Sequence, residues 1–437
     1  MRILFYTMQL GPRYHHGSER YVETLGGALT AAGHEVSYLA GDPLERASRS
    51  ELGEPVAWTA RLHAYPTSDW SAVEGLPAAA ASPWLADLAP DIVHVANPAH
   101  VGVGLLRACR ELGIPLVVTT MDFWWICPRA TLLRRGQEIC SGEPGWLECV
   151  RCTASDHPQK LLRAIARLPA YFSPLTLALM SASGLRRGHR VADALRWPRR
   201  RSLLLEHLSK ASQVIFPSTA LQRSLAPRLA EDRWSLIPYG LAEPWFEEPK
   251  KPLERPRAPE TLRVGFAGSL LPHKGAHLLL EAVGLLGWRR TLIRVAGRGE
   301  DPAYRERLAR AGEGLRVQYE GELDEGEMID FLRDIDVLVV PSRWPENLPF
   351  VLLEAQAANL PVIGSRVEGI AASIPDPARL FEADSARDLA RALEDFCGGV
   401  GDASTSPRVW TVQEMYSATE SVYRKAMERA PRASAIT

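Results

Sequence analysis

Two glutamates, Glu346 and Glu354, are separated by seven residues in the segment VLVVPSRWPENLPFVLLEAQAANLPVIG. This segment is typical of a buried strand over 337–340, a turn, and a helix whose first turn carries Pro349. Proline suits the first helical position because its φ is fixed and its missing N–H would be unpaired there. The second glutamate is therefore expected more than one turn into the helix.

The turn between the two acids predicts an anion site. The backbone amides of Asn347 and Leu348 would lie beside a helix N-terminus, where unpaired N–H groups favour a phosphate. A free phosphate would need no flanking carboxylates, whereas the hydroxyls of a sugar and a ribose would donate hydrogen bonds to them. The segment therefore indicates a nucleotide-sugar site.

The pattern strand-PS-x-W-P-E-N-x-P-x-x-x-x-E-A resembles the E-x7-E signature of retaining glycosyltransferases with the GT-B fold. In particular it is similar to glycosyltransferase family four, of the kind acting in bacterial cell-surface polysaccharide synthesis. The resemblance implies that Glu346 contacts the donor sugar and Glu354 the ribose. The plainer interpretation is a solvated helix face with incidental acids.

A glycine loop, GFAGSLLPHKG at 265–275, carries the next part of the resemblance. Gly268 permits a tight turn, and Lys274 could bring its ammonium group to a diphosphate. The family usually has an arginine directly after the glycine at position 268, and Ser269 replaces it here. Arg298 or Arg343 could compensate, while Lys274 could also be an ordinary surface lysine.

Two further glycine loops are similar to those of the family. Gly297 and Gly299 in VAGRGE resemble its nucleotide-base loop, although G-x-G after a strand is common. In PRYHHGSERYVETLGGALTAAGHEV, Gly17 and Ser18 would let the backbone approach the donor phosphates. Glu19 is expected to cap the helix that follows.

The predicted strand 115–120 ends in MDFWWICPR, where the family usually has His-Asp. Asp122 matches this pair and is a candidate catalytic residue, whereas Met121 replaces the histidine. His94 or the pair His15–His16 could lie near the reacting sugar, but a lone histidine is more often structural.

In the retaining mechanism that the resemblance implies, a departing diphosphate oxygen takes the acceptor proton on the same face. The protein then contributes positioning and charge stabilisation. Lys274 would stabilise the developing diphosphate charge, and Glu346 would position the sugar. No catalytic metal is expected. The DID at 334–336, which matches the metal-binding D-x-D of another fold, simply precedes a buried strand.

Departures from the family pattern leave other functions open. In VEGIAAS, Glu368 replaces a glycine and Ala372 stands where a glutamate is common. Together with Met121 and Ser269, these changes allow a degenerate, non-catalytic nucleotide- or glycan-binding protein. A nucleotide-sugar epimerase of the same fold is the enzymatic alternative.

Four cysteines fall within one predicted loop: Cys127, Cys140, Cys149 and Cys152. In a reducing cytosol, such a cluster closing with C-x-x-C favours a structural zinc site over disulfides. Reduced packing cysteines are the alternative. A zinc ion here would fix the loop beside Asp122. Cys109 and Cys397 are predicted core residues.

A basic, apolar stretch between Lys160 and Lys210 contains few opposing acids. It predicts either contact with an anionic membrane surface or an insertion with a solvated basic face. Its basic residues are Lys160, Arg163, Arg167, Arg186, Arg187, Arg196 and Arg199–Arg201.

Overall composition gives no argument for a nucleic-acid partner, because the net charge is −1. No secretory signal or apolar run of membrane-spanning length is recognised. We therefore expect a cytoplasmic protein, with peripheral contact at the inner face of the cell membrane. The expected partners are a nucleotide-sugar and a glycan or lipid-linked acceptor.

Alternating strands and helices position these motifs and predict an α/β protein. The expected plan is GT-B, with two doubly wound Rossmann-like domains facing a central cleft. The predicted parts are residues 1–240 with an insertion at 123–205, a linker at 241–260, a second domain at 261–411, and a helix with tail at 412–437 that crosses back. The predicted strands are 2–8, 35–40, 91–96, 115–120, 213–217 and 234–238, then 262–267, 292–296, 316–319, 337–340 and 361–364.

Overall fold

The computed structural model describes most of the chain. The described residues are 1–10, 17–43, 61–67, 78–99, 102–134, 138–143, 145, 148–149, 151–152, 200–247, 258–259, 262–400 and 407–429. They form two compact units. Unit 1 comprises Met1–Pro217, Leu221–Ile237 and Met415–Thr437, and unit 2 comprises Ser218–Ala220 and Pro238–Glu414.

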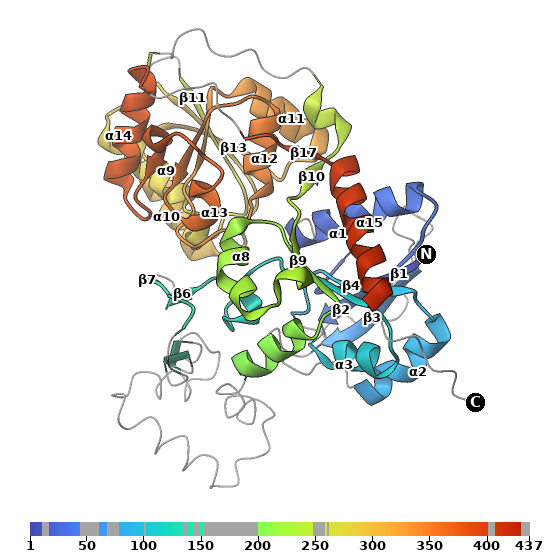
Figure 1. The fold of residues 1–437 in the computed structure, drawn as a ribbon. Coiled ribbons are helices and arrows are strands. Elements are labelled where there is room, and N and C mark those ends of the chain that lie inside the picture. Colours follow the sequence, from blue (N-terminus) through green and yellow to red (C-terminus); the bar gives the residue numbers. More distant parts are fainter. Residues whose placement is uncertain are drawn as a thin grey trace, which may run out of the picture. The chain divides into compact units, whose positions relative to one another are not determined.

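Unit 1 is built on a seven-stranded parallel sheet in the order β3-β2-β1-β4-β5-β8-β9 (Figure 1). Because β2 and β4 both pair with β1, the strand order reverses there, as in a doubly wound fold. The strands are β1 (Arg2–Thr7), β2 (Glu35–Pro43), β3 (Arg61–Thr67), β4 (Ile92–Val95), β5 (Leu116–Thr119), β8 (Gln213–Phe216) and β9 (Trp234–Leu236).

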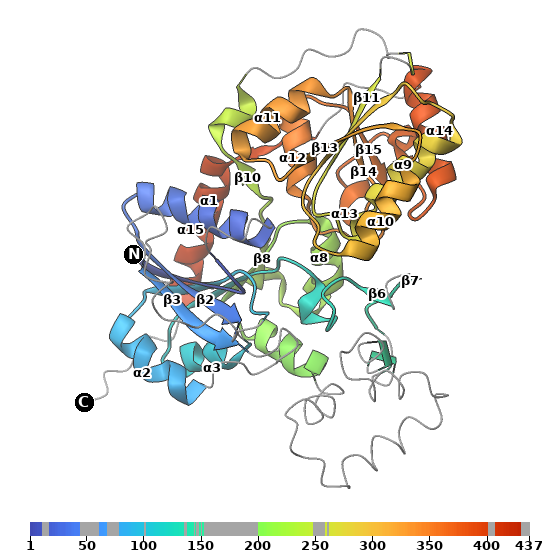
Figure 2. The same cartoon turned by 180° about the vertical axis from the view of Figure 1, so that it is seen from behind.

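Helices cover both faces of this sheet. Figures 1 and 2 show α2 (Ala78–Leu88) and α3 (Gly104–Glu111) on one face, with α1 (Gly17–Ala31) and α15 (Val412–Arg429) on the other. The central strands are continuous apolar runs because they are buried on both sides. Unit 1 also contains α8 (Thr219–Leu225), a helical segment at 200–209, the hairpin β6 (Leu133–Arg134) with β7 (Glu138–Ile139), and 3-10 turns at Phe123–Trp125, Ala226–Arg228 and Glu231–Arg233.

Unit 2 repeats the plan with a six-stranded parallel sheet in the order β13-β12-β11-β14-β15-β16. Here the order reverses between β11 and β14. The strands are β11 (Arg263–Ala267), β12 (Leu292–Ala296), β13 (Arg316–Gly321), β14 (Val337–Val340), β15 (Val362–Ser365) and β16 (Leu380–Phe381). A separate parallel pair joins β10 (Gly240–Leu241) to β17 (Trp410–Thr411).

The helices of unit 2 also divide between the two faces of its sheet. Figures 1 and 2 place α9 (Ala276–Leu285), α10 (Pro302–Ala311) and α14 (Ala386–Cys397) on one side, and α11 (Glu325–Asp334) and α12 (Phe350–Ala357) on the other. The remaining elements are α13 (Glu368–Ala371) and 3-10 turns at Glu243–Phe246, Pro272–Lys274 and Pro377–Arg379.

The doubly wound α/β prediction is confirmed, and the eleven predicted strands are all present within a few residues. Two strands of the main sheets, β3 and β16, were not predicted, nor were the two-residue strands β6, β7, β10 and β17. The β3 segment RLHAYPT offers no apolar run, and its proline suits the edge position that the strand occupies. The β16 strand has only two residues.

A buried hydrogen-bond chain ties α15 to the sheet of unit 1. The imidazole of His94 lies 2.6 Å from the Tyr423 hydroxyl and 2.7 Å from Thr119 Oγ1, which in turn lies 2.9 Å from the Tyr21 hydroxyl. All four side chains are almost fully buried. His94 is therefore a core histidine and not the group near a reacting sugar that we considered.

This buried imidazole predicts acid sensitivity of unit 1. Burial lowers the pKa of His94 to about 3, against about 6.5 in the unfolded chain. The unfolded state thus binds more protons between these values, and stability is lost as the pH falls from about 6.5 toward 3. The slope reaches about 1.4 kcal/mol per pH unit. His94→Gln should remove this slope from the opening free energy of the β4 amides, measured by hydrogen exchange.

Tyr423→Phe is the matched control. It removes one buried hydrogen bond, worth about 1 kcal/mol, yet keeps the imidazole and hence the pH slope. An unchanged slope in His94→Gln would contradict the role of this residue.

Candidate functional site

The predicted donor-site motifs gather where the strand order of unit 2 reverses. The loop after β11 carries Lys274, and the loop after β14 carries Glu346. β11 and β14 are neighbours whose crossovers run to opposite faces, so the carboxyl ends of these strands form a topological switch point. This is where open α/β sheets bind ligands.

An ion pair joins these two loops. Lys274 Nζ lies 2.7 Å from Glu346 Oε1, which also accepts from Ser342 Oγ at 2.7 Å and Trp344 Nε1 at 2.8 Å. Glu346 is only 5% exposed. A buried carboxylate needs such donors, because desolvation would otherwise penalise its charge. The lysine and the first glutamate, which are far apart in sequence, therefore form one site.

Trp344 adds a second contact to this pair. Lys274 Nζ lies 5.1 Å from the centre of the indole ring, within the range of a cation–π interaction. The indole thus donates a hydrogen bond to the acid and presents its face to the base. Three quarters of the lysine side chain is buried, so the prediction of an ordinary surface lysine is wrong.

Glycines bring the loops into contact. Gly275 has a φ of +79°, and a Cβ there would lie 2.0 Å from the carbonyl oxygen of Pro341. The amide of Arg343 donates to the carbonyl oxygen of His273 at 2.8 Å. Only glycine permits this approach at the end of the Lys274 loop.

The two other predicted glycines are also packed together. Gly268 and Gly297 have φ values of +150° and +135°, and a Cβ on Gly297 would lie 1.9 Å from the carbonyl oxygen of Gly268. A Cβ on Gly299 would lie 2.4 Å from the carbonyl oxygen of Leu270. The loops after β11 and β12 therefore expose backbone at the same edge of the sheet.

Buried side-chain contacts anchor the turn between the two glutamates. The Asn347 side chain accepts from Ser218 Oγ at 2.6 Å and donates to the Tyr239 hydroxyl at 2.9 Å. The Tyr239 ring in turn stacks on Phe350 at the start of α12, with ring centres 4.8 Å apart. Asn347 therefore holds the loop against the helix.

One prediction about this turn needs correction. Pro349 is the N-cap of α12 and not part of its first turn, since the helix begins at Phe350. Pro349 has an extended ψ of 127°, which a helical residue does not adopt. Glu354 nevertheless lies more than one turn into the helix, as expected, and is 1% exposed. Leu348 is partly buried.

Gly369 is a site residue that the sequence analysis missed. A Cβ there would lie 2.1 Å and 2.2 Å from the carbonyl oxygens of Glu346 and Asn347. The neighbouring Glu368 and Ala372, which depart from the family pattern, are both exposed. Close packing against the backbone of Glu346 and Asn347 thus requires glycine at position 369. In the sequence, the glycine of VEGIAAS was the signal that could have predicted this contact.

The arginines considered as substitutes for the missing arginine at Ser269 are already paired. Arg343 forms an ion pair with Asp384, its Nη2 lying 2.7 Å from the carboxylate. Arg298 interacts with Glu300 and Glu322 and is largely exposed. Lys274 is thus the basic side chain that contacts Glu346 among the described residues.

In unit 1, Asp122 follows β5 and caps a 3-10 turn. Its Oδ1 accepts from the Trp124 amide at 2.7 Å, and Asn97 Nδ2 donates to its Oδ2 at 3.4 Å. Burial raises the pKa of Asp122 to about 6, with opposing contributions from Trp124, Asn97 and Arg200. Its catalytic role stays a prediction.

The glycine loop of unit 1 is only partly described. Gly17 is the exposed first residue of α1, and the pair His15–His16 lies outside the described residues. Glu19 is fully buried in the first turn of the helix, where a carboxylate suits the positive end of the dipole. Its Oε2 accepts from Ser18 Oγ at 3.1 Å.

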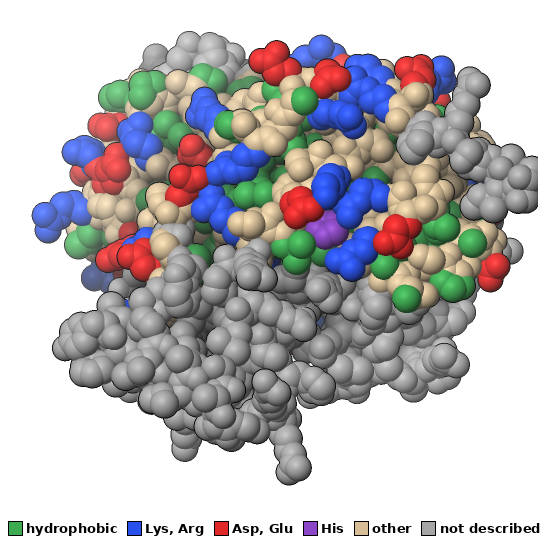
Figure 3. Space-filling model, turned by 60° about the horizontal axis from the view of Figure 1, so that its bottom comes forward, with side chains coloured by type: hydrophobic (Ala, Val, Ile, Leu, Met, Phe, Trp, Pro, Cys, Tyr) green, Lys and Arg blue, Asp and Glu red, His purple; other side chains and the backbone are tan. Residues whose placement is uncertain are grey.

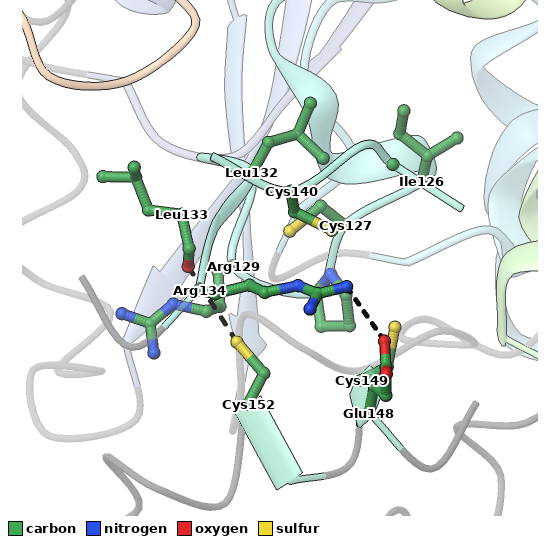
Figure 4. Close-up of a pocket in the computed structure, with 12 residues that line it drawn as sticks. Ile126, Cys127, Arg129, Leu132, Leu133, Arg134, Cys140, Glu148, Cys149 and Cys152 are labelled. Carbon is green, nitrogen blue, oxygen red and sulfur yellow. Dashed lines mark hydrogen bonds and ion pairs between the residues drawn. The ribbon is translucent and has the colours of Figure 1, made fainter. Parts of the chain in front are cut away.

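The four clustered cysteines line one pocket of unit 1 (Figure 4). All of them are free thiols. In the part of the chain that the structure describes, no three His, Cys, Asp or Glu side chains are close enough to hold a metal ion as they stand. The predicted zinc ion therefore stays a prediction. Cys109 is buried in the core, as expected, and Cys397 is half-buried.

Most of the basic stretch predicted to contact a membrane lies outside the described residues. Of its arginines, Arg200 is 2% exposed, and Arg201 pairs with Glu143 at 2.9 Å. On the face shown in Figure 3, acidic and basic side chains of the described residues are interspersed. Among the described helices, none is long and apolar enough to cross a membrane.

Comparison with known proteins then decides the family. A model described as "Glycosyl transferases group 1" matches residues 261–398, and one described as "Glycosyltransferase Family 4" matches residues 15–137. These two ranges together cover more than half of the chain. The chain belongs to glycosyltransferase family four.

Curated glycosyltransferases match part of the chain. A D-inositol 3-phosphate glycosyltransferase of Paenarthrobacter aurescens is 29% identical over 38% of this chain and 43% of its own length. A lipopolysaccharide 1,2-N-acetylglucosaminetransferase of Salmonella typhimurium is 28% identical over 42% of this chain and 54% of its own. The chain thus spans about half the length of these relatives.

Solved structures match over the whole chain. HepE from Anabaena in complex with UDP covers 97% of this chain and 100% of its own, with a TM-score of 0.58 and 14% identity. The lipopolysaccharide glycosyltransferase WaaG covers 98% of this chain and 100% of its own, with a TM-score of 0.53 and 15% identity. At such identities the likeness concerns the fold alone, which is GT-B.

We predict that Gly369→Ala destabilises unit 2 by about 1–3 kcal/mol, because the added methyl group would displace the backbone of Glu346 and Asn347. Gly284→Ala in α9 is the control. Nothing lies within 4 Å of its Cβ position, so alanine should stabilise the helix by about 0.5–1 kcal/mol. Urea unfolding measures both, and wild-type stability of Gly369→Ala would contradict the packing argument.

Proposed function

We propose that the protein is a retaining glycosyltransferase that moves a sugar from a nucleoside diphosphate donor to a glycan or lipid-linked acceptor. Family membership supports the reaction type. The observation that carries the proposal is the Lys274–Glu346 pair at the reversal point of the unit 2 sheet. A cation there suits a diphosphate, and an acid beside it suits sugar hydroxyls.

Lys274 and Glu346 would contact different parts of the donor. The three described donors to Glu346 all bind Oε1, which leaves Oε2 to accept from a hydroxyl group of the sugar. Lys274, held in place by Glu346 and Trp344, would stabilise the negative charge that develops on the leaving diphosphate. Such stabilisation needs a cation fixed before the reaction begins, and the buried pair supplies one.

The remaining donor contacts would come from backbone and from α12. Gly268 and Gly297 bring bare backbone to the same edge of the sheet, where a nucleotide could approach closely. The amides of Asn347 and Leu348 precede the helix N-terminus and would bind a phosphate. Glu354 would accept from the ribose hydroxyls. Gly17, at the N-terminus of α1, would let the backbone approach a phosphate.

The proposed acceptor is a glycan or a lipid-linked precursor. Curated relatives that glycosylate lipopolysaccharide or an inositol phosphate support a polar, hydroxyl-bearing acceptor. A role in cell-surface polysaccharide synthesis, with the protein cytoplasmic and peripheral at the membrane, fits the relative that acts on lipopolysaccharide. Asp122, whose carboxylate fixes the loop after β5, would orient that acceptor.

A donor screen tests the function. The purified protein is incubated with UDP-, GDP-, ADP- and dTDP-sugars while thermal unfolding and release of nucleoside diphosphate are followed. UDP-sugars come first, because HepE, which shares the fold, binds UDP-glucose. Stabilisation by one donor with slow release of its diphosphate is expected. Stabilisation without turnover, even with lipid-linked acceptors, would instead favour a non-catalytic binding protein.

Three substitutions test the proposed roles. Lys274→Met should lower kcat about 100-fold or more, because the leaving group loses its counter-charge. Glu346→Gln should also reduce turnover. Glu354→Gln should weaken donor binding about 10- to 100-fold in calorimetry, since a charged hydrogen bond contributes about 1.5–3 kcal/mol.

Glu368→Gln is the matched control, because Glu368 is exposed on α13 next to Gly369. It should leave both turnover and donor binding unchanged. Wild-type donor affinity in Glu354→Gln, with wild-type thermal stability, would remove this glutamate from the site.

A further inference from the structure

The loop after β5 brings four thiols to one small pocket in unit 1. The pocket is lined by Cys127, Cys140, Cys149 and Cys152, spaced C-x12-C-x8-C-x2-C. In Figure 4, Cys127 and Cys140 lie side by side above the pocket, whereas Cys149 and Cys152 approach from a helical turn below it. Two loop thiols and a C-x-x-C pair thus meet from opposite sides.

The backbone that presents Cys127 is held in an unfavourable conformation. Ala130 and Leu132 have φ values of +58° and +53°, which side-chain-bearing residues rarely adopt. Backbone hydrogen bonds maintain them, from Ala130 to the Cys127 carbonyl at 3.0 Å and from Cys140 to the Leu132 carbonyl at 2.6 Å. Local strain of this kind concentrates at functional sites.

This strained turn directs backbone donors at a sulfur atom. The amide groups of Arg129 and Leu132 donate to the Cys127 side chain. A protonated thiol is a weak acceptor, whereas a thiolate gains from each donor because charged acceptors make stronger hydrogen bonds. The turn therefore supplies two backbone donors to the Cys127 sulfur.

Cationic side chains surround the pocket. Arg134 hydrogen-bonds the Cys140 side chain, and Arg201 lies near Cys149. Arg200 is 2% exposed, interacts electrostatically with Cys127 and Cys149, and packs over the Trp124 ring at 4.8 Å. Its three guanidinium nitrogens have no hydrogen-bond partner among the described residues.

Arg200 needs a counter-charge. Burying a cation costs several kcal/mol, and Asp122 interacts with Arg200 electrostatically but makes no hydrogen bond to its guanidinium group. Neutral thiols would supply no such charge. A cluster of thiolates would supply negative charge close to Arg200, which interacts electrostatically with Cys127 and Cys149.

We propose that these four cysteines bind one structural zinc ion as thiolates, with Arg200 as a buried counter-charge. Binding releases one proton from each thiol to solvent and forms four Zn–S bonds, with no change of oxidation state. The product carries a formal charge of about −2, which Arg200 would offset in part, whereas Arg134 already forms an ion pair with Glu148 at 2.9 Å. An all-sulfur, tetrahedral set of this kind favours zinc.

Ligation requires the side chains to turn inward. Zn–S bonds are roughly 2.3 Å long, and no three metal-ligating side chains among the described residues already have the required spacing. The four thiols line one pocket, and binding would need all four side chains to turn toward one centre. This zinc ion would fix the loop that begins at Asp122, and the proposal stands whether or not the protein transfers sugars.

Metal content gives the first test. Full-length protein, purified without a histidine tag or chelator, is analysed for zinc and iron, and its free thiols are counted before and after denaturation. About one zinc per chain is expected, with four thiols becoming reactive on chelation, whereas the buried Cys109 reacts only after denaturation. Near-zero zinc, iron in its place, or disulfides among these cysteines would overturn the proposal.

Cobalt supplies a readout that does not depend on any variant. Protein stripped of metal under reducing conditions is titrated with Co²⁺. A sulfur-to-cobalt charge-transfer band and the intense visible bands of tetrahedral cobalt should saturate at about one equivalent, and Zn²⁺ should abolish them. Weak octahedral bands alone would exclude a thiolate site.

Variants then assign the ligands and the counter-charge. Cys149→Ser and Cys152→Ser should each lower zinc content at least several-fold, whereas Cys397→Ser, in α14 of unit 2, should leave it unchanged. Arg200→Met should retain the fold but lose zinc to a chelator at least several-fold faster, and Arg200→Lys should be intermediate. Equal rates of zinc loss to the chelator in the wild type, Arg200→Met and Arg200→Lys would show that this arginine is not part of the site.

Discussion

The ion pair between Lys274 and Glu346 is the interaction on which the loops at the carboxyl ends of the unit 2 strands depend. A carboxylate buried in the loop after β14 is tolerable only because a lysine, a serine and an indole donate to one of its oxygens. That need for donors holds the loops after β11 and β14 together. This close contact also requires glycine at positions 275 and 369, since any side chain there would push the loops apart.

The sequence was most informative where a residue type can serve few purposes. Apolar runs located the central strands, and the embedded E-x7-E pair located the loop and helix that carry Glu346 and Glu354. Contacts between distant segments could not be predicted. Nothing in the local pattern reveals that Trp344 contacts both members of the ion pair or that Asn347 is bonded to Ser218 and Tyr239.

The roles of His94 and Arg200 were harder to predict, because each depends on neighbouring side chains that the local sequence pattern does not reveal. His94 follows an apolar pattern equally suited to a core or a cleft, and three buried hydroxyl-bearing neighbours decide for the core. Arg200 stands in a run of arginines that suggested an exposed basic face, yet it is buried against Trp124. Charge density along a chain does not reveal the burial of a single side chain.

The docking of α15 has a consequence for biosynthesis. The core of unit 1 contains Tyr423, which is bonded to His94 of β4 more than three hundred residues earlier. A ribosome delivers β4 long before that tyrosine, so one face of the nascent N-terminal sheet is covered only in part, by α1, until α15 has been translated. Unit 2, formed mainly by the continuous segment Pro238–Glu414, can complete its own core first. The order of folding is thus expected to reverse the order of synthesis.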